Sequence, residues 1–447
     1  MARLFGTDGV RGLANGPVLT AGLALDLAMA AAHVLGRGAR GRLTALVGRD
    51  TRASGEFLEA AVTAGLAAAG VDVVLVGVLP TPGLAWLVAD RGADLGVMLS
   101  ASHNPMPDNG VKFLSRGGVK LPDEVEDLIE QELGADWELP RGDRVGRVRQ
   151  DPQAIEDYIA HLIASLPNGR LNGLRVVLDA ANGAASRTAV AAFEGVGAEV
   201  VGISLDPDGY NINQNCGSTD LTALRATAVS QGCDLGLAFD GDADRCLAVD
   251  HLGQVVDGDQ ILAILALALK DEGRLHLDTV VATVMSNLGF HQAMRAHGIA
   301  VDTTKVGDRY VLEAMNANNF TLGGEQSGHV ILSEYATTGD GVLTGLHLAS
   351  RVVQAKQPLA QLAQVMRAVP QVMINVAGVD RARANLDPQV NRAVRRAGER
   401  LDGRGRILLR PSGTEPVVRV MVEAPTTQEA EAVALELVAT LRERLSL

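Results

Sequence analysis

The segment from Asp240 to Arg245 reads Asp-Gly-Asp-Ala-Asp-Arg and carries three carboxylates at every second position. Charges this close repel one another, so a hard divalent cation is the expected counter-charge, and ligands that are all oxygen favour Mg²⁺ or Ca²⁺. An EF-hand calcium loop needs Gly sixth and Glu twelfth, where this chain has Arg245 and His251. The pattern therefore predicts a Mg²⁺ site at Asp240, Asp242 and Asp244, with Arg245 able to bind a phosphate beside it.

A second motif, residues 100–105, reads Ser-Ala-Ser-His-Asn-Pro and follows an apolar run. A small hydroxyl on a constrained loop, where a strand ends, is the expected setting for a nucleophile or phosphate carrier. Ser100, Ser102 and His103 could each be that carrier, and the residues alone do not rank them.

A third motif, residues 410–416, reads Arg-Pro-Ser-Gly-Thr-Glu-Pro and is followed by Arg419. Hydroxyls, backbone N–H groups and flanking arginines are suited to hold a phosphate. The spacing is not that of a P-loop, so a nucleoside triphosphate is not indicated. The predicted cradle consists of Arg410, Ser412, Gly413, Thr414 and Arg419.

A fourth motif runs from Gly324 to His329. Glu325, Gln326 and Ser327 offer donors and acceptors suited to vicinal sugar hydroxyls, and His329 could move a proton near neutral pH. Two shorter motifs contain Arg11 and Lys112, which carry little weight alone because surface cations are common.

The elements that must position these motifs alternate between strand and helix almost throughout, which is typical of an α/β fold. We expect helices over 20–36, 54–69 and 151–166, with Thr20, Ser54 and Asp151 as N-caps. Strands are expected over 43–47, 71–78, 94–99, 174–178, 199–203, 235–239 and 280–284.

Three consecutive blocks open alike, with an apolar strand, a polar turn and a helix; the turns are 48–52, 179–183 and 285–287. We therefore predict three similar mixed-sheet α/β domains and a smaller C-terminal α+β domain. The predicted bounds are 1–150 with the serine motif, 151–256 with the acidic motif, 257–369 with the sugar motif and 370–447 with the phosphate motif.

Length and composition limit the remaining choices. With 447 residues, two to four domains are expected, and the net charge of −13 argues against nucleic acid or an anionic membrane as partner. The longest apolar run, Ile261–Leu269, falls short of the roughly 20 residues that span a bilayer. The amino terminus has no apolar signal core and the three cysteines lack metal-ligand spacing, so we expect a cytoplasmic protein.

Taken together, these motifs resemble the α-D-phosphohexomutase superfamily, and most closely its phosphoglucosamine mutases. The resemblance runs from residue 7 to residue 416, with the motifs in order. Gln326 between Glu325 and Ser327, and the opening 5–12, are similar to the phosphoglucosamine mutases rather than to phosphomannomutase/phosphoglucomutase relatives. The resemblance implies four domains around one central cleft.

Carried over position by position, the resemblance implies a phosphoserine at Ser102. It implies one Mg²⁺ per active site, bound by Asp240, Asp242, Asp244 and a phosphate oxygen on Ser102. Further catalytic residues would be Arg11, Lys112, Arg245 and His329. Substrate-binding residues would be Lys305, Gly307, Glu325, Gln326, Ser327, Arg410, Ser412, Gly413, Thr414 and Arg419.

The activity implied by the resemblance is interconversion of glucosamine 6-phosphate and glucosamine 1-phosphate through a 1,6-bisphosphate, which would also serve as activator. Its product would enter UDP-N-acetylglucosamine and cell-wall precursor synthesis. The alternatives are a phosphomannomutase/phosphoglucomutase, a Mg²⁺-dependent phosphatase using the same serine, and a non-catalytic phosphosugar-binding protein. The residues leave open whether Lys112 or His329 is the base; they do not give the oligomeric state, although the resemblance is compatible with a homodimer.

Overall fold

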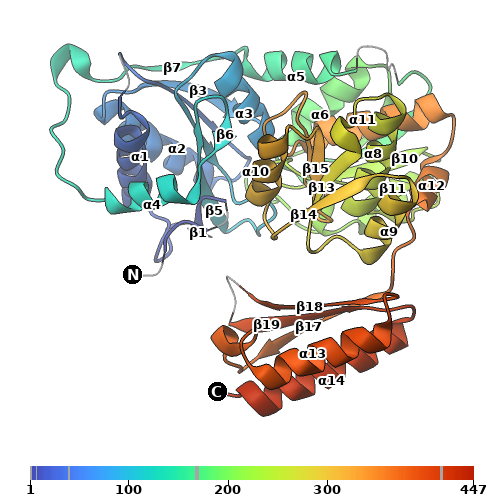
Figure 1. Ribbon diagram of the computed structural model, residues 1–447. Helices are drawn as coiled ribbons and strands as arrows, with labels where there is room; N and C mark the ends of the chain where they lie inside the picture. The colour runs from blue at the N-terminus through green and yellow to red at the C-terminus, as the bar shows by residue number, and fades with distance from the viewer. Residues whose placement is uncertain (1–2, 7, 39–40, 167–170, 413–415) are drawn as a thin grey trace. The chain divides into compact units, whose positions relative to one another are not determined.

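The computed structural model (Figure 1) describes residues 3–6, 8–38, 41–166, 171–412 and 416–447. The chain divides into two compact units, Met1–Met285 with Ile299–Val365, and Ser286–Gly298 with Met366–Leu447. Three of the four sheets lie in the first unit and the fourth lies in the second.

The three sheets of the first unit share one topology. In each sheet three strands pair in parallel in the order third, first, second along the chain, and an antiparallel strand flanks the third. In spatial order, the first sheet has β5 (Asp108–Ser115), β4 (Leu95–Leu99), β2 (Thr44–Arg49) and β3 (Asp72–Val78). The second sheet has β11 (Cys246–Asp250), β10 (Leu235–Phe239), β8 (Arg175–Asp179) and β9 (Glu199–Ile203). The third sheet has β16 (Val330–Leu332), β15 (Leu322–Gly324), β13 (Thr279–Thr283) and β14 (Ala300–Thr304). The predicted threefold repeat is confirmed.

Short strands extend this shared pattern, and helices cover the sheets (Figure 1). The added strands are β1 (Val10–Leu13), β6 (Val119–Lys120), β7 (Val148–Gln150) and β12 (Val255–Val256). The helices are α1 (Ala21–Leu35), α2 (Ser54–Ala68), α3 (Thr81–Asp90), α4 (Asp123–Gln131), α5 (Ala154–Ala164), α6 (Ala185–Gly195), α7 (Thr222–Ser230), α8 (Gly258–Asp271), α9 (Leu288–Ala296), α10 (Asp308–Asn318), α11 (Gly341–Ala355) and α12 (Leu359–Leu362). Among the described residues, no helix is long and apolar enough to cross a membrane.

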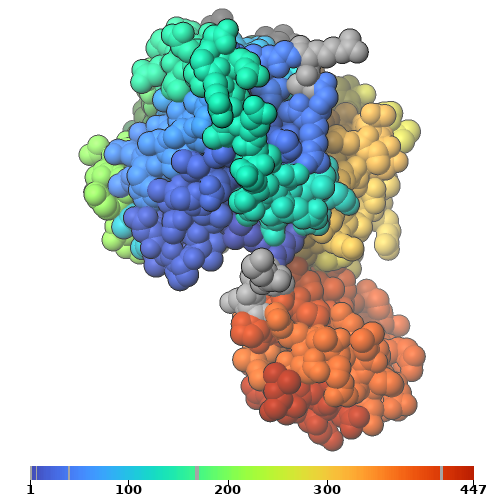
Figure 2. Space-filling model, turned by 90° about the vertical axis from the view of Figure 1, so that its left-hand side faces the viewer, coloured from blue at the N-terminus to red at the C-terminus, as the bar shows by residue number. Residues whose placement is uncertain are grey.

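The first sheet shows how the apolar pattern places the helices. Val47 and Val97 belong to one buried cluster with α1 and α2, whereas Leu46 and Met98 pack with α3 on the opposite face. This alternation follows from the two-residue period of a strand. Helix α4 packs against α1 through Ile129, and Figure 2 shows the teal residues around α4 lying against the blue amino-terminal segments.

One of the three predicted N-caps is confirmed. The Thr20 hydroxyl accepts from Leu23 N at 3.1 Å. The prediction for Ser54 is wrong, because α2 already begins at Ser54 and its hydroxyl instead accepts from Asn109 Nδ2. The prediction for Asp151 is also wrong: α5 begins three residues later, and the Asp151 carboxylate caps the turn before it.

The second unit is built on an antiparallel sheet of β17 (Gln371–Ala377), β19 (Val417–Glu423) and β18 (Arg406–Pro411). Helices α13 (Pro388–Leu401) and α14 (Thr427–Leu445) cover it, so the predicted α+β character of the smaller C-terminal part is confirmed. Helix α9 belongs to this unit too, because Leu288 N donates to the buried Glu423 carboxylate at 3.2 Å.

Candidate active site

Three of the predicted motifs occupy one topological position, the loop between the third parallel strand of a repeat and its antiparallel partner. The serine motif follows β4, the acidic motif follows β10 and the sugar motif follows β15. Each loop contains one residue in the left-handed region: Ser102 at φ 53°, Ala243 at φ 55° and Gly328 at φ 91°. The loops lie where the parallel strands end, which is where α/β sheets place their ligand sites.

The structure brings the serine motif and the acidic motif into direct contact. The Ser102 hydroxyl donates to Asp240 Oδ2 at 2.6 Å, and both residues are buried, with exposed fractions of 1% and 0%. Ser100 is turned away from the acids, because its hydroxyl donates to Asp50 Oδ2 at 2.6 Å. Of the two serines, Ser102 is the one that faces the acidic motif. His103 Nδ1 lies 3.3 Å from the same hydroxyl oxygen.

The acidic motif has the donor set of a cation site. Asp240, Asp242 and Asp244 each offer a carboxylate oxygen, and the three oxygens lie within 4.8 Å of one another. Oδ1 of Asp242 and of Asp244 are buried without a hydrogen-bond partner among the described residues. Buried carboxylate oxygens in this state are costly unless a cation binds them, so the residues present fit Mg²⁺.

Charge is distributed unequally within the acidic motif. Burial raises the pKa of Asp240, and the neighbouring carboxylates of Asp244 and Asp242 raise it further. Burial opposes ionisation of Asp242 too, but its pKa is held below the usual range by Lys112 Nζ at 2.7 Å and by the Thr81 hydroxyl at 2.5 Å. Of these two carboxyl groups, Asp242 is therefore the more readily ionised.

Three helix N-termini point backbone N–H groups at the acidic motif. Thr81 N of α3 donates to Asp242 O at 3.0 Å, Ala184 N before α6 donates to Gly241 O at 2.8 Å, and Gly341 N of α11 donates to Ala243 O at 2.9 Å. A helix N-terminus carries partial positive charge and unpaired N–H groups, both of which stabilise nearby carboxylates. The loop is thus held, and its charge offset, by all three repeats.

Cations and anions alternate around this loop. Lys112 Nζ lies 2.7 Å from both Asp242 Oδ2 and Asp8 Oδ2. Burial lowers the pKa of Lys112, but these two carboxylates raise it above its ordinary value. Asp8 also pairs with Arg11 at 2.7 Å and with Lys120 at 3.1 Å, and Lys120 pairs with Asp308.

Arg245 completes the cationic rim of the acidic motif. Its Nε lies 3.7 Å from Asp244 Oδ1. Burial alone would lower the pKa of Arg245, whereas Asp244 and Asp240 raise it. The guanidinium therefore stays charged beside the predicted phosphate position.

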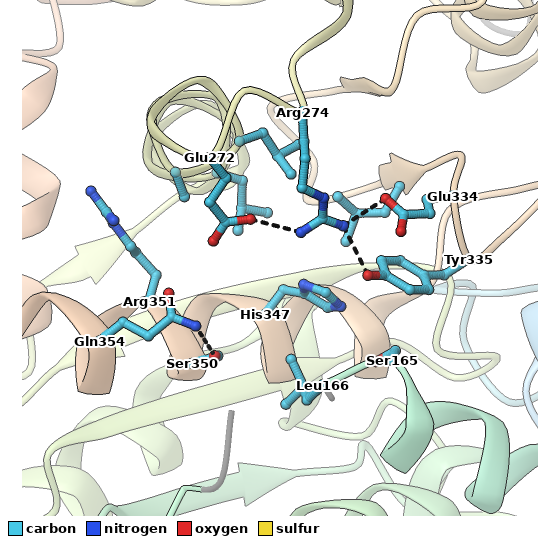
Figure 3. Close-up of a pocket in the computed structure, with 14 residues that line it drawn as sticks. Ser165, Leu166, Glu272, Arg274, Glu334, Tyr335, His347, Ser350, Arg351 and Gln354 are labelled. Atoms are coloured by element: carbon cyan, nitrogen blue, oxygen red, sulfur yellow. Dashed lines mark hydrogen bonds and ion pairs between the residues drawn. The ribbon is translucent and has the colours of Figure 1, made fainter. Parts of the chain in front are cut away.

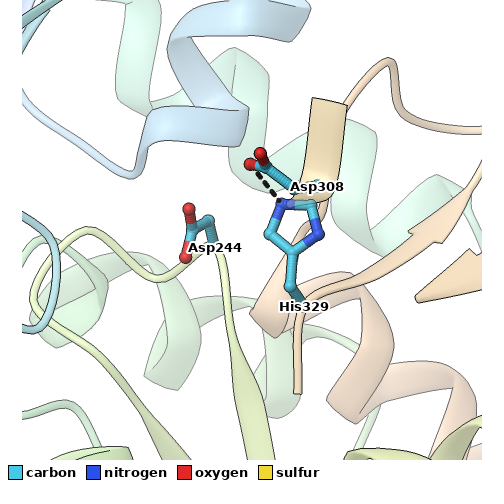
Figure 4. A group of neighbouring side chains, drawn as sticks. All are labelled: Asp244, Asp308 and His329. Carbon is cyan, nitrogen blue, oxygen red and sulfur yellow. Dashed lines mark ion pairs between the residues drawn. The ribbon is translucent and has the colours of Figure 1, made fainter. Parts of the chain in front are cut away.

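The sugar motif joins the same region through His329 (Figure 4). Its exposed fraction is 2%, and its Nε2 lies 3.5 Å from Asp308 Oδ2, with Asp244 as the third member of the group. Neither ring nitrogen has a hydrogen-bond partner within the described chain. A Cβ atom at Gly339 would lie 2.4 Å from His329 Nε2, so the His329 ring fits here because residue 339 is a glycine.

Of the remaining polar side chains in the sugar motif, two make hydrogen bonds and one does not. Glu325 Oε1 accepts from Gly307 N at 3.2 Å, and Gln326 Nε2 donates to Asp257 Oδ2 at 3.3 Å. Ser327 Oγ is buried and has no hydrogen-bond partner among the residues described. Lys305 Nζ lies 5.7 Å from the centre of the Tyr310 ring.

In the second unit, the phosphate motif begins in the last residues of β18, and its final residue, Pro416, directly precedes β19. Arg410 and Arg419 are directly opposite each other in the register of β18 and β19, so their side chains leave the same face of the sheet. Ser412 N donates to Val417 O at 2.9 Å, and Ser412 O accepts from Arg381 Nη1 at 2.8 Å. Gly413 and Thr414 lie outside the described residues.

A separate cavity of about 330 Å³ in the first unit contains none of the predicted site residues (Figure 3). Arg274 in its wall donates to Glu272 at 2.7 Å, Glu334 at 2.6 Å and the Tyr335 hydroxyl at 2.8 Å. Because this cation is already paired with two acids, the cavity is poorly suited to a phosphosugar.

Sequence reasoning missed several residues of the site. Asp8 stands inside the opening 5–12 and Asp308 directly follows the predicted residue Gly307, so their charge close to predicted cations was a usable signal. Lys120 and Thr81 had no such signal, because only the tertiary structure brings them to the acidic motif and its neighbour Asp8, and Arg381 had none because only the tertiary structure brings it to Ser412 of the phosphate motif.

Comparison with known proteins identifies one family along the chain. Profiles of the phosphoglucomutase/phosphomannomutase family match residues 2–138 (α/β/α domain I), 156–253 (domain II), 257–369 (domain III) and 349–440 (C-terminal domain). The chain is 65% identical to the phosphoglucosamine mutase of Cutibacterium acnes and 59% identical to that of Streptomyces coelicolor, each over 100% of both chains. A crystal structure of a phosphoglucomutase/phosphomannomutase family protein from Burkholderia thailandensis is 25% identical, with a TM-score of 0.82 over 100% of this chain and 99% of that one.

Proposed function

Because the chain belongs to the phosphoglucomutase/phosphomannomutase family of the α-D-phosphohexomutase superfamily, we propose that it interconverts glucosamine 6-phosphate and glucosamine 1-phosphate. The names of its relatives support this substrate. The observation that carries the chemistry is the Ser102 hydroxyl, which lies 2.6 Å from a carboxylate of the buried acidic motif.

Ser102 would carry the phosphoryl group in the resting enzyme. The bond from its oxygen to phosphorus breaks as the 1-hydroxyl of glucosamine 6-phosphate attacks, which gives the 1,6-bisphosphate. Transfer of the 6-phosphoryl group back to Ser102 then leaves glucosamine 1-phosphate. Between the two transfers the bisphosphate must turn end for end.

Asp240, Asp242, Asp244 and the phosphate on Ser102 would hold Mg²⁺, in keeping with the unpartnered oxygens of the acidic motif. When bound, the ion would offset the charge on the transferring group and polarise it. Arg11, Lys112 and Arg245 would add positive charge around the phosphoryl oxygens.

We propose His329 rather than Lys112 as the base that takes the proton of the sugar hydroxyl. Lys112 is held as an ammonium ion between Asp8 and Asp242, and its pKa is raised, so it is a poor acceptor. His329 has a buried ring whose nitrogens have no hydrogen-bond partner within the described chain, which leaves one able to accept.

Substrate contacts follow the two remaining motifs. The sugar hydroxyls would meet Lys305, Gly307, Glu325, Gln326 and Ser327. The phosphate that is not reacting would bind at Arg410, Ser412, Gly413, Thr414 and Arg419. The paired arginines Arg410 and Arg419 could accept either end of the bisphosphate, as the reaction requires.

We propose the four domains with the predicted bounds 1–150, 151–256, 257–369 and 370–447. The other features that go with this function are a cytoplasmic location, activation by a sugar 1,6-bisphosphate and assembly as a homodimer, and they stay predictions.

The proposed function is tested by intact mass and by substrate preference. We expect one phosphate on the purified chain, mapped to Ser102, and the highest kcat/KM on glucosamine 6-phosphate among the glucosamine, glucose and mannose 6-phosphates. Ser102→Ala should lose the phosphate and at least about 10³-fold in kcat. The matched variant Ser100→Ala should keep the phosphate on Ser102. A preference for glucose or mannose, or release of inorganic phosphate faster than isomer formation, would contradict the proposal.

A further inference from the structure

Arg52 is a fully buried arginine, with an exposed fraction of 0%, in the turn between β2 and α2. Its guanidinium has five N–H donors, and the structure provides five acceptors. These acceptors are Asp50 Oδ2 at 2.9 Å, Pro105 O at 2.6 Å, Asp108 O at 2.9 Å, Ser102 O at 3.1 Å and Asn104 O at 2.8 Å. The other four are backbone carbonyls between Ser102 and Asp108, where the loop after β4 (residues 100–107, here called the serine loop) runs into β5, so a single side chain binds most of that loop.

The loop needs such support because the backbone of Ser102 has a φ of 53°, a conformation that residues other than glycine rarely adopt. On one side of this residue, Ser102 N donates to Ser100 Oγ at 2.9 Å, and Ser100 Oγ donates in turn to Asp50. On the other side, the Ser102 carbonyl accepts from Arg52. Asp50 and Arg52 thus hold both peptide groups of the strained residue.

Asn213 reaches the same carbonyls from the second repeat. Its Nδ2 lies 2.8 Å from Ser102 O and 3.1 Å from Asn104 O, the two oxygens that Arg52 Nη2 also binds. The strained turn is therefore clamped between a guanidinium of the first repeat and an amide of the second.

We infer that Arg52, together with Asp50 and Asn213, is a positioning group that keeps Ser102 left-handed and so directs its hydroxyl at Asp240; this inference rests on the proposed function. Arg52 does not touch the reacting atoms. The planar guanidinium carries donors on separate nitrogens and can therefore bind four carbonyls at once. Lysine has three donors on one nitrogen and cannot replace it.

The test compares Arg52→Lys with Arg49→Lys. Misplacing a reacting oxygen costs far more in turnover than in binding, so Arg52→Lys should lower kcat about 100-fold with KM changed less than about threefold. Arg49 is the last residue of β2, directly before that turn, and its Nε faces Glu59 at 3.6 Å. Arg49→Lys should keep kcat within about twofold. A purely structural role would lower the amount of folded protein and leave kcat per folded molecule unchanged, which would overturn the inference.

Amide hydrogen exchange gives a readout that does not depend on activity. In Arg52→Lys, peptides covering 100–108 should exchange at least about tenfold faster, while peptides covering 240–245 keep the wild-type rate. If Arg52→Lys does not fold, Asn213→Ser keeps the guanidinium and should show the same pattern, with kcat about tenfold lower. Wild-type exchange and kcat in the variant that folds would overturn the inference. A wild-type protein inactive on every phosphosugar would overturn the proposed function instead, and faster exchange of 100–108 would still support the clamp.

Discussion

The serine loop and the acidic loop (the acidic motif, residues 240–245) occupy equivalent positions in the first and second repeats, and each contains one left-handed residue. They are nevertheless held by different groups. Ser102 and Ala243 have φ values of 53° and 55°. Backbone N–H groups at three helix N-termini hold the carbonyls of the acidic loop. Side chains, Arg52 above all, hold the carbonyls of the serine loop. The metal-binding half of the site thus depends on helix placement and the serine half on side-chain identity.

The turn after the first strand of each repeat shows where the difference arises. Asp50 and Asp179 both accept from the backbone N–H two residues later, at 2.9 and 3.0 Å. That later residue is Arg52 in the first repeat and Ala181 in the second. Both repeats therefore have this turn, and in the first repeat the side chain of Arg52 also binds the neighbouring serine loop.

The largest expected effect comes from crowding the helix that holds the acidic loop. A Cβ on Gly341 would lie 2.2 Å from Arg245 O and 3.0 Å from Ala243 O, so Gly341→Ala must displace α11 or the loop. We expect a loss of about 2–3 kcal/mol in the free energy of unfolding and about 100-fold in kcat. Chemical denaturation and steady-state kinetics measure both.

The control for that variant is Gly22→Ala in the first turn of α1, where the nearest atom would be 3.8 Å away. We expect stability to change by less than about 1 kcal/mol and kcat to stay the same. An equal loss in both variants would mean that crowding at the acidic loop is not the cause.

Lowering the pH should destabilise α11, the helix whose N-terminus holds the acidic loop, before it affects the residues that hold the serine loop. Burial, reinforced by Arg274, lowers the pKa of His347 on α11 to about 4 from 6.5. Between these values the unfolded chain binds more protons, so stability is retained above pH 6.5 and falls as the pH drops towards 4.

From pH 7.5 to pH 5 the fall should be about 1–2 kcal/mol, and His347→Gln should reduce it. Urea midpoints at the two pH values measure this change, and hydrogen exchange at pH 5 should show peptides of 240–245 opening before those of 100–108. The same pH dependence in His347→Gln would exclude this histidine as the cause.

The smallest expected effect tests whether side chains matter at the acidic loop. Thr81→Val removes the hydroxyl that donates to Asp242 Oδ2, but it keeps the backbone N–H that donates to Asp242 O. We expect about a fivefold loss in kcat, from about 1 kcal/mol of lost hydrogen bonding, with Mg²⁺ affinity reduced by a similar factor. A loss as large as that of Gly341→Ala would mean that the hydroxyl, not the helix, supports the loop.

The sequence allowed prediction wherever chemistry is local. Asp240 to Asp244 and the serine motif stand directly after apolar strands, so the α/β pattern predicted that each lies at a strand end, whereas their meeting at one site was implied only by the family resemblance. Residues such as Arg52 and Lys120 could not be predicted, because a cation that is enclosed by the fold looks the same in sequence as one on the surface. Ser54 and Asp151 failed as N-caps for a related reason: another acceptor or donor, supplied by the folded chain, competes for each side chain.

The row of partly buried ion pairs from Arg11 through Asp8 and Lys120 to Asp308 has a consequence for redesign. Lys120 is shared between acids of the first and third repeats, so neutralising Asp308 alone would leave that ammonium unbalanced beside Asp8. Changes that alter sugar preference near His329 should therefore be made in complementary pairs. Related proteins with a different residue at position 308 are expected to carry a matching change at position 120.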